Sequence, residues 1–171
     1  MKNVEVLVLH GSPGSGKTTL SRAIAELLRT AAMPHAVIDL DDLSKIYPHP
    51  GRAFALENLR AYGPNFAAVA DLKVVIPSVI ADVAELSQLR LAAPASRLIV
   101  CELTAPKDVL KQRVTAREPN EYWQVRLQNF VDLYHRRLDL QHIRDFQVTT
   151  HDRPIAESAS EVIEKAGWLK R

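Results

Sequence analysis

Short apolar runs and longer stretches of helical spacing alternate along the chain. An apolar run over residues 4–9 predicts a first strand, and further strands are expected at residues 35–39, 74–76, 98–101 and 146–150. Apolar spacing predicts helices over residues 17–30, 53–72, 80–91, from 106, 120–138 and 154–166, the second of them bent or divided at Gly63-Pro64. Because parallel neighbours need crossover connections, this alternation predicts an α/β fold: a parallel sheet with helices on both faces.

The composition fits one globular domain over residues 1–171. Hydrophobic residues make up 47% and charged residues 25%, which excludes a disordered or fibrous chain. The formal net charge of +2 is too small to indicate nucleic acid or a membrane surface as partner. No apolar run reaches the roughly 18 residues of a membrane span, and the N-terminus does not resemble a secretory signal, so we expect a cytoplasmic protein. The single cysteine, Cys101, is expected to be a buried, inert thiol.

A glycine-rich stretch between the first strand and the first helix carries the clearest chemistry. Its sequence, GSPGSGKT over residues 11–18, fits the phosphate-loop pattern G-x-x-x-x-G-K-[ST] in the strand, loop, helix setting that the pattern requires. Such a loop turns backbone N–H groups toward phosphate oxygens at the positive end of a helix. We expect Lys17 to neutralise the β and γ phosphates and Thr18 to ligate Mg²⁺. The predicted nucleotide-binding residues here are Gly11, Ser12, Pro13, Gly14, Ser15, Gly16, Lys17, Thr18 and Thr19.

Acidic residues follow the second expected strand, at Asp39, Asp41 and Asp42. Ligands of parallel sheets bind at the carboxyl ends of the strands, so these acids and the phosphate loop are expected at one edge. The third expected strand ends without a carboxylate and the fourth carries Glu102 at best. Asp39 and Asp41 are therefore the stronger candidates, one acting on Mg²⁺ and the other accepting a proton from a substrate hydroxyl. The alternative is that these acids cap the next helix or are simply solvated.

Basic residues gather after the fourth expected strand. Arg113 and Arg117 are one helical turn apart, so they share a helix face and could close over phosphates as a lid. A charged, solvated helix face is the alternative, and we prefer it for Arg126, Arg136 and Arg137. The aromatic residues of the same region, Trp123, Phe130 and Tyr134, fit a core stripe better than a base-stacking platform, and His10 is expected to serve packing or hydrogen bonding.

Taken together, these motifs resemble the P-loop small-molecule kinases, such as shikimate, gluconate and adenylyl-sulfate kinases, and their nucleotide kinase relatives. The segments that carry the resemblance are residues 11–18, Val37-Ile38-Asp39-Leu40-Asp41, and Leu110-Lys111-Gln112-Arg113 followed by Arg117. The resemblance implies a three-layer P-loop NTPase fold with strand order 2-3-1-4-5 and a small helical lid near residues 113–138.

The same resemblance implies roles for particular residues and for the cofactors ATP and Mg²⁺. Asp41 would face the acceptor hydroxyl, Asp39 the Mg²⁺ shell, and Arg113 and Arg117 the nucleotide, with Arg117 among the catalytic groups. The segment 151–154 would lie near the adenine, which makes Arg153 a nucleotide contact. Shikimate kinases carry a glycine run after the third strand, where this chain has Ile76-Pro77-Ser78-Val79, so shikimate is not favoured as the acceptor.

The sequence therefore predicts a P-loop kinase that moves the γ-phosphoryl of Mg·ATP to a hydroxyl of a small molecule, as a monomer or homodimer. A regulatory or accessory nucleotide-binding protein with slow ATP hydrolysis is the alternative. The two differ in whether an acceptor pocket lies beside Asp41. Nucleic-acid end phosphorylation would need a continuous basic groove, which the near-balanced charge argues against. Residues available to line the acceptor pocket are Arg52, Asn58, Arg60, Tyr62 and Asn65, and the alternative is that each is a surface residue of the second expected helix.

Overall fold

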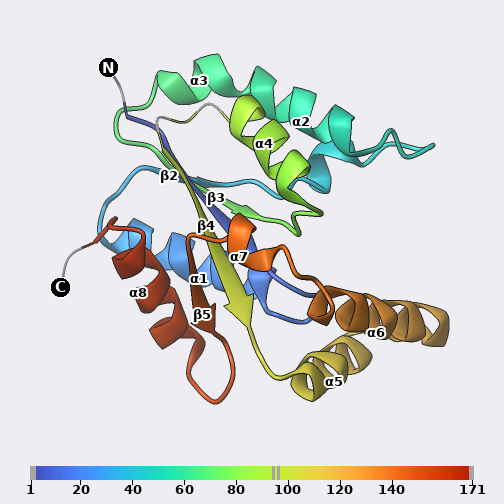
Figure 1. Cartoon of the computed structure of the whole chain (residues 1–171). Helices are drawn as coiled ribbons and strands as arrows, with labels where there is room; N and C mark the ends of the chain where they lie inside the picture. The colour runs from blue at the N-terminus through green and yellow to red at the C-terminus, as the bar shows by residue number, and fades with distance from the viewer. Residues whose placement is uncertain (1–2, 94, 96, 170–171) are drawn as a thin grey trace.

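A parallel five-stranded sheet forms the centre of the computed structural model, which describes residues 3–93, 95 and 97–169 (Figure 1). The strands are β1 (Glu5–His10), β2 (His35–Val37), β3 (Lys73–Pro77), β4 (Arg97–Thr104) and β5 (Phe146–Thr149). They pair in the order β2-β3-β1-β4-β5, all in parallel. The α/β fold and the strand order 2-3-1-4-5 expected from the sequence are thus confirmed.

Helices surround this sheet in the positions that the apolar spacing predicts. They are α1 (Lys17–Thr30), α2 (Arg52–Ala61), α3 (Gly63–Ala67), α4 (Val83–Ala92), α5 (Lys107–Arg117), α6 (Glu121–His135), α7 (Leu140–Ile143) and α8 (Ile155–Lys165), with a 3-10 turn η1 (Asp42–Ser44). The expected break at Gly63-Pro64 separates α2 from α3. The short elements η1 and α7 were not expected. None of the described helices is both long and apolar enough to cross a membrane.

The two faces of the sheet are buried against different helices. Along β1, Val6 and Val8 join the core formed with α2 and α4, whereas Leu7 and Leu9 join the core formed with α1 and α8. All four side chains are fully buried, because alternate residues of a central strand point to opposite faces. Cys101 is also buried, and its burial raises the pKa of the thiol, as expected for an inert cysteine.

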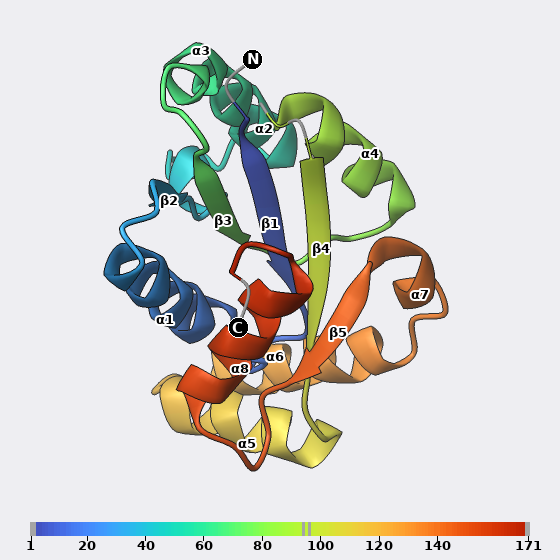
Figure 2. The same ribbon diagram turned by 90° about the vertical axis from the view of Figure 1, so that its left-hand side faces the viewer.

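The carboxyl end of the sheet is the place where a ligand is expected to bind. Helices α2, α3 and α4 lie on one face, α1 and α8 on the other, and α5 and α6 lie beyond the end toward which β4 points (Figures 1 and 2). The carboxyl ends of the strands meet at this end, which is where parallel sheets bind their ligands. Asp132 of α6 ties the helices there together, since it pairs with Lys107 and Lys111 of α5 at 2.8 Å each.

Candidate active site

The phosphate loop has the backbone that its glycines allow. Gly14 has a φ of 81° and Gly16, the N-cap of α1, a φ of 90°, a region that L side chains rarely adopt. At Gly14 a Cβ atom would also lie 2.7 Å from the carbonyl oxygen of Leu110 on α5. The glycine therefore permits both the turn and the close packing of α5 against the loop.

Lys17 lies folded over this loop. Its Nζ donates to the carbonyl oxygens of Gly11 at 2.9 Å and of Ser12 at 3.0 Å. Burial, assisted by the nearby charge of Arg117, lowers the pKa of Lys17 to about 8, while the charges of Asp41 and Asp39 act in the opposite sense. An ammonium group held in this way is poorly compensated, so phosphate oxygens are a better partner than two neutral carbonyls.

The loop also holds polar groups that fit a triphosphate. The buried hydroxyls of Ser12 and Ser15 have no hydrogen-bond partner among the described residues. Since buried polar atoms are normally satisfied, these hydroxyls suit a ligand with acceptor oxygens. Thr18 and Thr19 are exposed at the start of α1. No group of three or more potential metal-ligating side chains occurs in the described part of the chain, so Mg²⁺ there would depend on phosphate oxygens as well as on Thr18.

The two expected acids lie at the end of β2. Oδ1 of Asp39 accepts the backbone N–H of Asp41 at 3.0 Å, which fixes the turn into η1. Burial raises the pKa of Asp39, as do the charges of Asp41 and Asp42, while the N–H of Asp41 acts in the opposite sense. The carboxylate of Asp41 is almost fully exposed, and Asp42 pairs with Lys45. Neither Asp39 nor Asp41 caps η1 through its side chain.

A cavity of about 320 Å³ joins these acids to the phosphate loop. Arg52, at the first turn of α2, crosses one side of the cavity. Its Nε donates to Glu85 at 2.6 Å, its Nη2 donates to the hydroxyl of Ser78 and to the carbonyl of Val79, and its Nη1 lies 3.6 Å from Asp41. The residues that line the cavity are Lys17, Thr18, Asp39, Asp41, Arg52, Pro77, Ser78, Val79 and Glu85.

Arg113 connects the phosphate loop to the end of β5. Its Nη1 donates to the carbonyl of Gly14 at 3.2 Å and to the hydroxyl of Thr150 at 3.1 Å, and its Nη2 donates to the carbonyl of Thr150 at 2.8 Å. The hydroxyl of Thr150 in turn donates to the carbonyl of Ser15 at 3.0 Å. Arg113 thus braces the loop from behind, while Arg117, one turn later, is exposed and close enough for its charge to act on Lys17.

The charge of Arg153 is paired with acidic residues of α8. It pairs with Glu161 of α8 and, at 4.0 Å, with Glu157. These residues line a separate open cavity of about 510 Å³ at the start of α8. A contact between Arg153 and the base of a nucleotide stays a prediction.

His10 is a buried hydrogen-bonding residue, as expected, but the polar network that it joins behind the loop was not expected from the sequence. His10, the last residue of β1, is fully buried, and its Nδ1 accepts the backbone N–H of Ile80 at 2.9 Å. Its Nε2 lies 3.1 Å from the hydroxyl of Tyr134, which donates to Glu102 at 2.9 Å. Glu102 also pairs with Arg144. Burial lowers the pKa of His10 to about 3, assisted by the charges of Arg137 and Lys17, so the ring is neutral.

Three expectations for α6 and its C-terminal end are wrong. Trp123 and Phe130 are 47% and 42% exposed, and they flank the guanidinium of Arg126 at 5.5 and 5.6 Å instead of filling a core. Only Tyr134 of the three aromatic residues is buried. Arg137 is not on a solvated face, because it donates to the carbonyl of Ile80 at 2.7 Å and pairs with Asp139. The apolar spacing of one helix does not show how much of that helix its neighbour covers, and α5 covers only part of α6.

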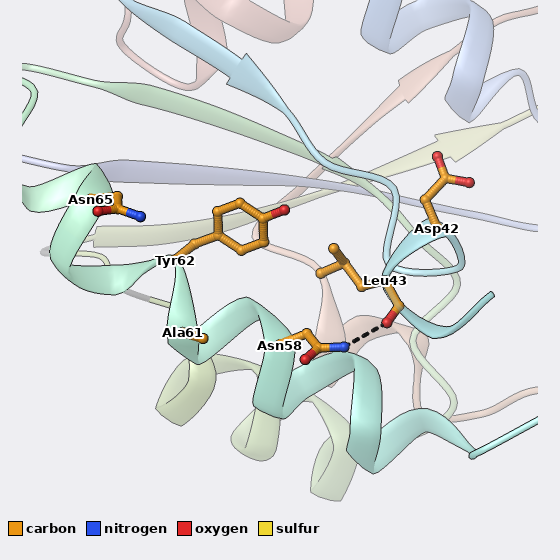
Figure 3. A pocket seen from close by; sticks show the side chains of 6 residues that line it. All are labelled: Asp42, Leu43, Asn58, Ala61, Tyr62 and Asn65. Atoms are coloured by element: carbon orange, nitrogen blue, oxygen red, sulfur yellow. Dashed lines mark hydrogen bonds between the residues drawn. The ribbon is translucent and has the colours of Figure 1, made fainter. Parts of the chain in front are cut away.

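The candidate acceptor residues separate into different places. Asn58, Tyr62 and Asn65 line another open cavity, of about 450 Å³, beside η1, where Nδ2 of Asn58 donates to the carbonyl of Leu43 at 2.8 Å (Figure 3). Arg60 pairs with Glu57 in a further cavity. Of the five residues, Arg52 alone lies in the cavity that contains Lys17 and Asp41.

Comparisons with known proteins show that the chain shares its fold with small-molecule kinases. The Zeta toxin family matches residues 2–71, the segment with the phosphate loop and the acids after β2. A search of curated proteins finds no match. The structure is similar to the Mycobacterium tuberculosis APS kinase solved with AMPPNP and APS, at 21% identity over 98% of this chain and 99% of that chain, with a TM-score of 0.67.

Two further solved structures show the same likeness. A Sinorhizobium meliloti gluconokinase has 22% identity, covers 98% of this chain and 94% of its own, and has a TM-score of 0.65. An Acinetobacter baumannii shikimate kinase in complex with shikimate has 18% identity, 99% and 97% coverage, and a TM-score of 0.56. The chain therefore has the fold of the P-loop small-molecule kinases that its motifs resemble.

Proposed function

We propose that this protein is an ATP-dependent phosphotransferase that moves the γ-phosphoryl group of Mg·ATP to a hydroxyl of a small molecule. The observation that carries the proposal is the cavity of about 320 Å³ in which Lys17 and Thr18 face Asp39 and Asp41. Phosphoryl transfer needs a phosphate cradle, cations for the moving group and a carboxylate beside the acceptor, and these are the groups that meet there.

The phosphate loop holds the nucleotide in this proposal. Backbone N–H groups of residues 11–18 and the unpartnered hydroxyls of Ser12 and Ser15 bind phosphate oxygens. Lys17 exchanges the carbonyls of Gly11 and Ser12 for the β and γ phosphates. Thr18 and Asp39 would hold Mg²⁺, which when bound neutralises part of the phosphate charge.

Asp41 accepts the proton of the acceptor hydroxyl as that oxygen bonds to the γ phosphorus. The bond from the γ phosphorus to the bridging oxygen breaks, and ADP leaves with its electron pair. The products are a phosphate monoester, ADP and one proton. Arg117, whose charge already acts on Lys17, stabilises the negative charge on the transferring group. Arg113 keeps the loop in place through Gly14 and Thr150.

A regulatory protein that hydrolyses ATP slowly is the second candidate. Such a protein needs the phosphate loop but no acceptor site, and the cavity beside Asp41 supports the transferase instead. We expect the enzyme to act in the cytoplasm, as a monomer or homodimer, without nucleic acid as substrate.

The test is a screen of hydroxyl-bearing metabolites for ADP release in the presence of Mg·ATP. We expect at least one metabolite to stimulate ADP release about tenfold or more above the rate with water alone, since a positioned acceptor outcompetes water. The Lys17→Met protein measures the background of contaminating kinases. Release that no metabolite stimulates would favour the regulatory protein.

A further inference from the structure

We infer that the acceptor of this enzyme carries no carboxylate, sulfate or phosphate group; this inference rests on the proposed function. The structural feature behind it is Arg52, which is the only cation apart from Lys17 among the described residues that line the cavity. Lys17 and Arg117 are assigned to the nucleotide phosphates in the proposed function, so Arg52 is the group that an anionic acceptor would have to use.

Arg52 already has its donors and its charge engaged. Its Nε–H is taken by Glu85 at 2.6 Å, and its Nη2 donors are taken by Ser78 and the carbonyl of Val79. A planar guanidinium binds a carboxylate through two parallel donors, and no such pair is left. The remaining nitrogen, Nη1, lies 3.6 Å from Asp41. What remains is a donor for a neutral oxygen.

Glu85 is held in place by its surroundings, so water does not readily replace its ion pair with Arg52. Its side chain is 15% exposed, and its second oxygen accepts the backbone N–H of Ala81 at 2.7 Å. Its own backbone N–H is held by Asp82, the N-cap of α4. Releasing Arg52 to an anion would leave Glu85 as a largely buried, unpaired charge, which is strongly unfavourable.

The other charges of the cavity repel an anion. Lys17 and Arg52 contribute two positive charges, and Asp39, Asp41 and Glu85 contribute three negative charges, which gives a net charge of −1. Mg·ATP keeps a net negative charge even with its metal ion, so the bound nucleotide makes this balance more negative. The remaining lining residues, Pro77, Ser78 and Val79, are uncharged. This balance suits an acceptor that is a neutral hydroxyl compound or one that carries an amine. Such an acceptor differs from APS, gluconate and shikimate, which are all anions.

The experiment uses small molecules extracted from bacterial cells and separated on an anion exchanger. The flow-through holds neutral and cationic compounds, and the retained fraction holds anions. Each is incubated with radiolabelled Mg·ATP and the protein, with Lys17→Met protein as background. We expect label in a flow-through compound, at about tenfold or more over any retained compound. Label in a retained compound overturns the inference and leaves the phosphotransferase intact. Label in neither fraction overturns the proposed function and the inference with it.

A second measurement tests the role of Glu85. Gluconate is used as a carboxylate probe that competes with the labelled flow-through acceptor. In Glu85→Gln protein Arg52 loses its ionic partner, so we expect gluconate to inhibit at concentrations about tenfold lower than in the parent protein. The matched control is Glu57→Gln, because Glu57 pairs with Arg60 outside this cavity. Circular dichroism checks that both variants fold. Equal inhibition of parent and Glu85→Gln protein would show that Glu85 does not mask Arg52, contrary to the inference.

Discussion

The phenolic hydroxyl of Tyr134 on α6 donates a hydrogen bond of 2.9 Å to Glu102 of β4. The same oxygen lies 3.1 Å from Nε2 of His10, whose other nitrogen accepts the N–H of Ile80. The proton of the neutral imidazole is therefore on Nε2, and the bonds run in one direction from His10 through Tyr134 to Glu102. This series of hydrogen bonds joins His10, the residue before the phosphate loop, to helix α6 at the end of the sheet.

Removing the hydroxyl of Tyr134 takes one hydrogen-bond partner from His10 and one from Glu102. We expect Tyr134→Phe to lower the free energy of unfolding by about 1–3 kcal/mol, because Nε2–H of His10 and one oxygen of Glu102 become buried and unsatisfied. Urea denaturation measures the loss. Tyr122→Phe is the control, since Tyr122 is 64% exposed and its loss should stay within about 0.5 kcal/mol. Equal effects of the two changes would mean that the network adds nothing.

His10 should make the protein sensitive to mild acid. Its pKa is about 3 in the folded protein and near 6.5 in the unfolded chain, so between these values the unfolded chain binds the extra proton. Stability therefore rises with pH in this window and falls as pH drops below 6.5, by up to about 1.4 kcal/mol per pH unit. Urea denaturation at pH 6.5 and 5.5 measures the slope.

The acid response has its own control. His10→Asn keeps a side-chain acceptor and donor but does not titrate, so the loss between pH 6.5 and 5.5 should be smaller than in the parent protein. His142→Asn, an exposed residue of α7, should leave the loss unchanged. An identical slope in the parent and His10→Asn proteins would assign the effect to other groups.

Lys17 should make nucleotide affinity depend on pH in the alkaline range. Its pKa of about 8 in the free protein means that the ammonium form is present below pH 8 and is lost above it. Triphosphate binds the ammonium form, so affinity for AMPPNP should fall by up to about tenfold per pH unit above 8. Titration calorimetry at pH 7 and 9, in buffers of different ionisation enthalpy, measures both the affinity and the proton uptake.

Lys17→Met should remove this pH dependence and weaken binding by about 1.5–3 kcal/mol, the usual loss for a hydrogen bond to a charged group. Lys165→Met is the control, because Lys165 pairs with Glu161 on α8, far along the chain from the loop. A pH-independent affinity in the parent protein would contradict the role given to Lys17.

The carboxylates after β2 can be separated by paired substitutions. Asp41→Asn should slow transfer by about 10²–10⁴-fold, the usual contribution of a general base, while AMPPNP affinity stays near that of the parent protein. Asp42→Asn is a close control, since Asp42 pairs with Lys45 and does not line the cavity with Lys17. Transfer at the parental rate in Asp41→Asn would show that another group accepts the proton.

The fold could be predicted from the sequence wherever burial is nearly complete. The runs that became β1 and β4 are apolar because both faces of a central strand are covered, and α1 matches its predicted range of 17–30. Prediction failed where one helix covers another only in part. The apolar stripe of α6 contains both buried Tyr134 and exposed Trp123, and spacing alone does not distinguish them.

The candidate site also has one part that could be predicted from the sequence and one part that could not. The residues of the loop from 11 to 18 are local in sequence, so their pattern could be recognised directly. Arg52, Ser78 and Glu85 come from α2, the end of β3 and α4, and their contact depends on packing that no local pattern encodes. His10 and Tyr134 are also far apart in the chain. A histidine directly after the apolar run Val6-Leu7-Val8-Leu9 was the one available signal for that network.

The most direct test of the account is a crystal structure of the protein with Mg²⁺ and AMPPNP. We predict that the terminal phosphate lies in the loop of residues 11–18, with Lys17 released from the carbonyls of Gly11 and Ser12 and turned to the phosphates. Asp39 and Asp41 should face that phosphate across the cavity. A structure in which the loop holds no phosphate, or in which both aspartates point away from it, would contradict the proposed phosphotransferase.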